Sequence, residues 1–297
     1  MKIKLNNKIL TLKKLELNDE NYFSFKPQFQ FISCEYAFSN LFLWSDSYPV
    51  KWTDYDGTPL IYSELDDFLF FPLKNNLPYQ LHDLSNAFIE AGGSGIIAYL
   101  PLEYINNHPD LKNLFLCTEN RSLAEYIHLS EKLVKLSGRK LSKKKNHISQ
   151  FYKKYQNVKN ELITPENIEK CLELSLLNAV DSNQNHSEEI LALKKAINHF
   201  VDLNLDGMML IVDSKCAAFS IFSKHIDGSC LIHFEKSDYA FKGASQVINK
   251  IIAEYLVEKY NCTHINREQD LGVEGLRKNK LSYDPDILFK NYFLAPL

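Results

Sequence analysis

The side chains best suited to chemistry lie near the C-terminus, within the sequence THINREQDLGVEGLRKNKLSYDP at residues 263–285. Asn266, Arg267 and Glu268 directly follow a short apolar run that is typical of a strand. A guanidinium can bind a carboxylate or a phosphate through two parallel N–H donors, so Arg267 is a candidate clamp for an anionic group. The alternative is a local salt bridge between Arg267 and Asp270. The segment therefore predicts either an anion-binding surface or a network of ion pairs.

A helix predicted from about residue 274 brings two further cations to the same region. Arg277 and Lys280 are three residues apart, a spacing that puts both on one face of a helix. Basic side chains there suit the phosphodiester or the aminoacyl ester of an RNA. Together with Asn266 and Tyr283, they are the candidate substrate-binding residues of this segment. The alternative for Arg277 is a salt bridge with Glu274.

A further carboxylate lies near the end of the strand predicted at residues 230–237. Because side chains alternate along a strand, His233 and Glu235 face one way and their neighbours face the other. A carboxylate at this place can accept a proton from an attacking amine or hydroxyl. Glu235 and Glu268 are therefore the candidate catalytic bases, and Arg267 is the third catalytic candidate. The alternative is that Glu235 belongs to an ordinary surface pair beside a turn.

The long helix predicted at residues 243–260 begins with a candidate anion site. A helix N-terminus offers free N–H groups and the positive end of the helix dipole. Gly243 permits close approach to the backbone, and Lys242 adds a positive charge. The candidate cofactor-binding residues are Lys242, Gly243, Ala244, Ser245 and Gln246. The alternative is an ordinary helix start that binds nothing.

Positive charge is concentrated between Lys132 and Lys159, where ten Lys or Arg residues occur without any Asp or Glu. The rest of the chain then holds 24 basic and 37 acidic residues, from totals of 34 and 37. Such a segment, with Lys143 and Lys144 at its centre, is expected to follow a tRNA backbone or an anionic membrane surface. No DNA is expected as a partner. The alternative is a solvated linker helix, since residues 148–155 carry an apolar stripe at helical spacing.

Several kinds of function lack their sequence signature. There is no GxSxG, P-loop or HExxH motif, so direct transfer is favoured over a covalent intermediate. The six Cys form no CxxC pair, so we expect buried thiols in a reducing cytoplasm and no metal site. No signal-peptide segment and no apolar run of ~20 residues occurs, so we expect a cytoplasmic protein without a transmembrane segment.

Hydrophobic periodicity predicts alternating strands and helices in both halves of the chain. In the first half we expect strands at 59–65, 67–73, 94–100 and 114–118, with helices at 79–92 and 102–108. In the second half the order is one strand, two helices, three strands, the long helix, a strand, a helix and a final strand at 287–294. This is the element order of the GNAT acyltransferase fold. It predicts an α/β protein with a mixed sheet, and in that fold the fourth and fifth strands splay apart around the acyl donor.

Four stretches of the sequence resemble the DUF2156 family, which is related to the C-terminal domain of phosphatidylglycerol lysyltransferase. They are HFEKSDYAFKGASQVINK, INREQDLGVEGLRKNKLSYDP, EYAFSNLFLW and GRKLSKKKNHISQFYKKY. The resemblance implies two GNAT-like domains in tandem, as in Fem-type peptidyltransferases, which take aminoacyl groups from aminoacyl-tRNA. We place a degenerate first domain at residues 1–137, and a second domain with the basic linking helix at 138–297.

The sequence thus predicts an acyl- or aminoacyl-transferase that uses aminoacyl-tRNA or an acyl-CoA as donor and an amine or hydroxyl as acceptor. In the second domain Glu235 or Glu268 would be the base, and Arg267 and Lys280 would hold anionic groups. The alternative is a non-catalytic protein that binds RNA or a small amino-acid or nucleotide ligand. Labelled transfer from charged tRNA distinguishes the two.

Overall fold

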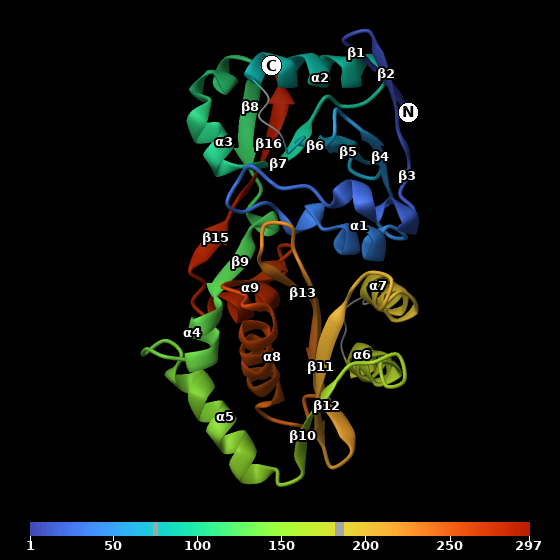
Figure 1. The fold of residues 1–297 in the computed structure, drawn as a ribbon. Helices are drawn as coiled ribbons and strands as arrows, with labels where there is room; N and C mark the ends of the chain where they lie inside the picture. Colours follow the sequence, from blue (N-terminus) through green and yellow to red (C-terminus); the bar gives the residue numbers. More distant parts are fainter. Residues whose placement is uncertain (74–76, 182–186) are drawn as a thin grey trace. The chain divides into compact units, whose positions relative to one another are not determined.

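The computed structural model describes residues 1–73, 77–181 and 187–297 and divides the chain into two compact units. The first unit is formed by Met1–Ala124 with Phe289–Leu297, and the second by Glu125–Leu288 (Figure 1). Each unit has its own seven-stranded sheet with both parallel and antiparallel neighbours, so the expected α/β class with mixed sheets is confirmed.

The division between the units differs from the one expected after residue 137. Strand β9 (Glu125–Leu129) pairs with a strand of the second unit, and β16 (Asn291–Pro296) pairs with strands of the first. The single strand expected at 287–294 is therefore two strands in different sheets. These pairings join residues far apart in the sequence, and periodicity reports only the local conformation of each strand.

The first unit is built on a sheet with the order β3-β4-β5-β6-β7-β16-β8, beside a separate β1-β2 hairpin. Its strands are β1 (Lys2–Leu5), β2 (Lys8–Thr11), β3 (Lys13–Lys14), β4 (Val50–Asp54), β5 (Pro59–Ser63), β6 (Phe68–Phe70), β7 (Ile97–Pro101), β8 (Phe115–Glu119) and β16. Its helices are α1 (Phe38–Trp44), α2 (Pro78–Glu90) and α3 (Leu102–Asn107), with short 3-10 turns at Leu17–Phe23, Cys34–Tyr36, Pro109–Asn113 and Arg121–Leu123. Both expected helices of this half are confirmed as α2 and α3.

The second unit is built on a sheet with the order β10-β11-β12-β13-β14-β9-β15. Its strands are β9, β10 (Val158–Leu162), β11 (Asp206–Val212), β12 (Lys215–Lys224), β13 (Cys230–Ser237), β14 (His264–Gln269) and β15 (Ile287–Phe289). Its helices are α4 (Ser130–Lys135), α5 (Ser142–Lys154), α6 (Glu169–Asp181), α7 (Ser187–Asn198), α8 (Ala244–Tyr260) and α9 (Glu274–Leu281). From β10 to α9 the element order is the expected one.

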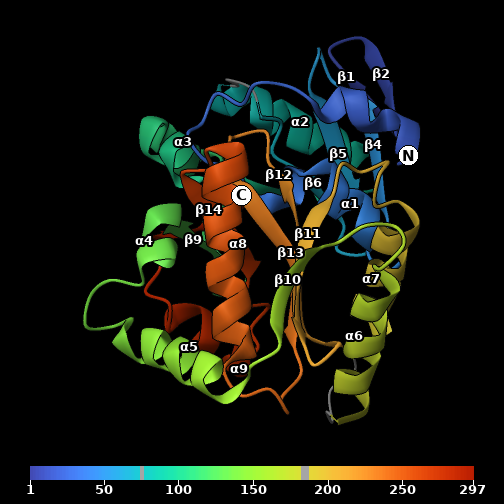
Figure 2. The same ribbon diagram turned by 60° about the horizontal axis from the view of Figure 1, so that its bottom comes forward.

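Helices cover both faces of the second sheet. Figures 1 and 2 show α8 on one face and α6 with α7 on the other. The apolar face of α8 forms one buried cluster with β11, β12 and β13, which includes Val247, Leu210, Phe222 and Ile232. Phe151 of α5 joins the same cluster. Burying each large apolar side chain stabilises the fold by about 1.5–3 kcal/mol, so this cluster fixes α5 and α8 against the sheet.

Candidate functional site

The two central strands of the second sheet, β13 and β14, run parallel and pair over a short distance only. Cys230 pairs with Ile265 and Leu231 with Asn266, and the pairing then ends. Both strands continue beyond that point, β13 to Ser237 and β14 to Gln269. Their next side chains, which include all three candidate catalytic residues, therefore stand where the two strands diverge, as the sequence predicted.

Each of the two diverging strands contains a bulge, which changes the direction of its side chains. The register between β12 and β13 shifts by one residue at His233, and Arg267 with Glu268 together oppose Tyr126 of β9 alone. Glu268 has a φ of +55°, in the left-handed region that few non-glycine residues adopt. Bulges of this kind locally bend a strand and turn a side chain out of the regular alternation.

Arg267 reaches across the divergence to Glu235. Its Nη2 lies 2.8 Å from Glu235 Oε1, and Asn249 Nδ2 of α8 donates to Glu235 Oε2 at 3.2 Å. Arg267 is only 8 % exposed, and its Nη1 is buried without a hydrogen-bond partner within the described ranges 1–73, 77–181 and 187–297. Buried donors are nearly always satisfied, so Nη1 is a candidate contact for a ligand.

Lys144 and Tyr283 join this arginine. The Arg267 guanidinium carbon lies 4.7 Å from the centroid of the Tyr283 ring, and Lys144 Nζ lies 4.1 Å from it. Burial, and then the charge of Arg267, lowers the pKa of Lys144, while burial raises the pKa of the Tyr283 hydroxyl. Lys144 of the basic segment is thus brought together with Arg267 and Tyr283 of the C-terminal segment, beside the Glu235 carboxylate.

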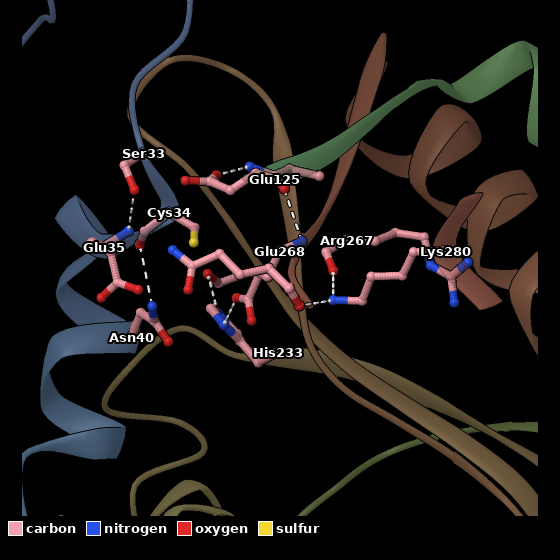
Figure 3. A network of polar contacts seen from close by, with 12 residues as sticks. Ser33, Cys34, Glu35, Asn40, Glu125, His233, Arg267, Glu268 and Lys280 are labelled. Atoms are coloured by element: carbon pink, nitrogen blue, oxygen red, sulfur yellow. Dashed lines mark hydrogen bonds and ion pairs between the residues drawn. The ribbon is translucent and has the colours of Figure 1, made fainter. Parts of the chain in front are cut away.

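Asn266 and Lys280 hold the bulge of β14 in place. Asn266 is fully buried, donates to Glu125 Oε2 at 2.6 Å and accepts from the Glu268 backbone N–H at 2.8 Å. Lys280 donates to the carbonyl oxygens of Arg267 and Gln269 (Figure 3). Both residues were predicted to bind substrate, and in the structure their polar atoms support the backbone of the bulge.

Arg277 forms an ion pair inside the segment. Its Nε and Nη2 lie 3.0 and 2.9 Å from the two oxygens of Asp270, which also accepts from Tyr126 Oη at 2.5 Å. Burial alone would raise the pKa of Asp270, but the hydrogen bonds from Arg277 and Tyr126 outweigh it and hold that pKa well below its usual range. A salt-bridge network was one of the two expectations for this segment, and the observed pairs are Arg267 with Glu235 and Arg277 with Asp270.

The start of α8 is approached by α5. Gly243 has a φ of +99°, and a Cβ atom built there would lie 3.1 Å from the His147 carbonyl oxygen and 3.2 Å from Phe151 Cβ. The N–H of Ala244 donates to Phe241 and that of Gln246 to Gly243. The close approach that Gly243 permits is therefore made by α5, and anion binding at Lys242–Gln246 stays a prediction.

The lysines of the basic segment differ in pairing and in exposure, and some, such as Lys140, are both paired and exposed. Lys132 lies 3.2 Å from both Asp284 and Asp286, and Lys140 lies 2.7 Å from Asp284. Lys143 is exposed on α5, whereas Lys144 points inward to Tyr283. Only the exposed lysines are available for a partner outside the chain.

The sequence did not point to Ser223, Tyr126 or His128, and it placed His233 on a face without giving it a role. His233 lies between Ser223 and Glu268, at 2.8 Å from Ser223 Oγ and 2.9 Å from Glu268 Oε1, and Figure 3 shows it pointing to Glu268. His128 is fully buried, and burial followed by the charge of Arg267 lowers its pKa to about 3. No motif marks these residues, because they meet through pairing between strands.

Neither a metal-ligand cluster nor a membrane-spanning helix occurs within the residues that the structure describes. Residues 1–73, 77–181 and 187–297 contain no group of three His, Cys, Asp or Glu side chains that could hold a metal ion. Over the same part of the chain, no helix is long and apolar enough to cross a membrane. All six cysteines are free thiols, and four of them are buried.

Known proteins share this fold over nearly the whole chain. A protein of unknown function from Bacteroides thetaiotaomicron is 29 % identical, with a TM-score of 0.88 over 97 % of this chain and 100 % of its own. L-PGS from Bacillus licheniformis is 14 % identical, with a TM-score of 0.61 over 87 % and 86 % of the two chains. FemX is 8 % identical, with a TM-score of 0.54 over 97 % of each chain. The last two likenesses show the fold alone.

The family is shown by the sequence itself. The model of the family described as phosphatidylglycerol lysyltransferase, C-terminal, matches residues 27–295, which include both diverging strands and the basic segment. This confirms the resemblance seen in the four sequence stretches. The chain belongs to the phosphatidylglycerol lysyltransferase C-terminal family.

Proposed function

We propose that the chain is an aminoacyl- or acyl-transferase and that its second unit holds the reaction centre where β13 and β14 diverge. The donor is an aminoacyl-tRNA or a CoA-type ester, and the acceptor is an amine or a hydroxyl. The family name and the shared fold of L-PGS and FemX support this class of reaction. The proposal includes two GNAT-like domains in tandem, one in each unit.

The observation that carries the proposal is the buried Arg267 guanidinium beside the diverging strands, with the half-buried Lys144 next to it. Arg267 and Lys144 lie on the same tyrosine ring, and Glu235 is the carboxylate that pairs with them. A buried guanidinium with an unsatisfied donor is costly, so the Nη1 of Arg267, which is unpaired within the described residues, favours an anionic ligand there. The phosphate of a donor, or the carboxylate of a substrate, would accept from this buried, unpaired Nη1 of Arg267.

The reaction at this place would be a direct transfer. The acceptor nitrogen or oxygen attacks the donor carbonyl carbon, and the bond from that carbon to the donor's leaving oxygen or sulfur breaks. The acceptor proton passes to a carboxylate, Glu235 or Glu268, and then to the leaving atom. General base catalysis of this kind contributes about 10²–10⁴-fold to the rate.

Transfer of a labelled amino acid or acyl group tests the proposal. The full chain is incubated with tRNA charged with a mixture of labelled amino acids, or with labelled acyl-CoA, and with vesicles containing phosphatidylglycerol or a soluble amine. Because removing one partner of a buried pair leaves the other charge uncompensated, the neutral pair Arg267→Gln with Glu235→Gln is compared with wild type. Lys250→Gln on the outer surface of α8 is the control for a lost lysine.

We expect transfer by the wild type and by Lys250→Gln, and loss of transfer in the double variant. Transfer that is equal in all three proteins would show that the Arg267 site takes no part in it. Absence of transfer from every donor, with retained binding of tRNA or of a free amino acid, would favour the binding protein.

A further inference from the structure

Three side chains on neighbouring strands form one hydrogen-bonded row. Ser223 lies on β12, His233 on β13 and Glu268 on β14. His233 Nε2 is 2.8 Å from Ser223 Oγ, and His233 Nδ1 is 2.9 Å from Glu268 Oε1. An ionised carboxylate can only accept, so Nδ1 carries a hydrogen, and in the neutral imidazole Nε2 then accepts from the serine hydroxyl.

The row has the hydrogen-bonding pattern of an activated serine, but here the carboxylate end is the exposed end and the serine end is buried. In a serine nucleophile the hydroxyl meets the substrate and the carboxylate lies behind the histidine. Here the His233 side chain is fully buried, Ser223 is 5 % exposed, and the Glu268 side chain is the most accessible at 17 %. A ligand therefore meets the carboxylate first, and Ser223 lies at the closed end.

The backbone also presents Glu268 in one fixed geometry. Its left-handed φ of +55° is unfavourable for a non-glycine residue and persists only where the surroundings enforce it. The backbone N–H of Glu268 donates to Asn266 Oδ1 at 2.8 Å. Lys280 donates to the carbonyl oxygens of Arg267 and Gln269, the residues on either side of Glu268. The strained residue is thus supported by side-chain bonds at three neighbouring backbone positions.

Glu235, the other candidate base, is engaged differently. One of its oxygens accepts from Arg267 at 2.8 Å and the other from Asn249 at 3.2 Å. Both oxygens of Glu235 are therefore occupied by hydrogen bonds from other side chains, and an attacking N–H or O–H would have to compete with one of these donors. Glu268 instead has His233 Nδ1 at 2.9 Å from its Oε1, a contact that orients the carboxylate.

We propose that Glu268 is the proton acceptor of the transfer reaction and that His233 and Ser223 are positioning residues that hold it. The inference rests on the proposed function and deepens it. Glu268 Oε2 takes the proton from the attacking N–H or O–H as the new bond to the carbonyl carbon forms. The same proton passes to the donor's oxygen or sulfur as that atom leaves, so Glu268 ends ionised.

The histidine tautomer tests the row without any assay of transfer. Ring-¹⁵N histidine spectra of the full chain are assigned to His233 by the loss of one ring in His233→Asn. We expect a protonated Nδ1 and an unprotonated Nε2 in wild type, the same state in Ser223→Ala, and loss of this preference in Glu268→Leu. A wild-type His233 protonated on Nε2 alone would overturn the proposal.

Kinetics then separate positioning from nucleophilic roles. We expect Glu268→Gln to lower kcat by about 10²–10⁴-fold. Ser223→Ala should lower kcat by about tenfold or less, as expected for one hydrogen bond, with KM for the donor unchanged. His233→Leu should lower kcat more than His233→Asn, because Asn keeps a donor near the position of Nδ1.

Ser220→Ala is the matched control, since Ser220 is a fully buried serine of β12 whose hydroxyl has no partner within the described residues. It should leave kcat unchanged. If the Glu268→Gln variant transfers at the wild-type rate, the inference is overturned while the proposed function stands. An acyl group found on Ser223 by mass spectrometry, with donor alone, would overturn it in favour of a nucleophile. If wild type transfers nothing, the proposed function fails and the tautomer spectra still decide whether the row exists.

Discussion

Replacing Gly243 by alanine tests which neighbour requires the glycine at the start of α8. The new Cβ would lie 3.1 Å from the His147 carbonyl oxygen and 3.2 Å from Phe151 Cβ, at a φ of +99°. An L-residue held at positive φ costs about 1–2 kcal/mol, and overpacking against α5 adds about 1–3 kcal/mol. We therefore expect Gly243→Ala to lower the free energy of unfolding of the second unit by about 2–5 kcal/mol.

Two other glycines separate the backbone contribution to this loss of stability from the packing contribution. Gly138 also has a positive φ, +92°, but a Cβ there would find nothing within 4 Å. Gly138→Ala should therefore cost only the backbone part, about 1–2 kcal/mol. Gly275 lies inside α9 with nothing within 4 Å, so Gly275→Ala should be neutral or should stabilise the helix by up to about 1 kcal/mol.

Hydrogen–deuterium exchange of the α5 and α8 amides measures these differences locally. Tryptophan fluorescence would not serve, because Trp44 and Trp52 both lie in the first unit. The largest loss of protection is expected in Gly243→Ala, in both helices. If Gly243→Ala and Gly138→Ala lose the same free energy, contact with α5 is not what requires the glycine, and its positive φ alone would account for it.

Three further predictions concern charge. Burial and nearby positive charges lower the pKa of His128 to about 3, whereas the unfolded chain binds this proton near pH 6.5, so stability falls as pH falls through that window. His128→Leu should flatten this part of a plot of urea midpoint against pH. Burial alone would raise the pKa of Asp270, but its hydrogen bonds outweigh burial and hold the pKa below its usual value. The stability that the ionised Asp270 contributes is therefore present above about pH 3.9 and is lost as the pH falls below it. Asp270→Asn should remove this acid-dependent component from circular dichroism titrations. Lys143→Glu with Lys145→Glu should weaken tRNA binding in filter assays and reduce its salt dependence, whereas Lys250→Glu should not.

The elements around the site could be predicted because their signals are local. The run of apolar residues in β11 and the helical spacing along α8 depend on the sequence within each element. The charged residues after the strand of β14 were identified as candidates because Arg, Glu and Lys are the side chains that bind anions and move protons. Their partners could not be predicted: Arg267 pairs with Glu235 and not with Asp270, because bulges turn neighbouring residues to different sides.

The sequence by itself determined the family, the α/β class, the order of elements from β10 to α9 and the set of charged residues that meet at the diverging strands. The tertiary structure alone decided three features. It put β9 into the second sheet and β16 into the first, it turned Lys144 inward onto Tyr283, and it joined Ser223, His233 and Glu268 in one row. The physical reason is that periodicity and residue type are properties of a segment, whereas strand pairing and bulge positions depend on contacts between segments far apart in the chain.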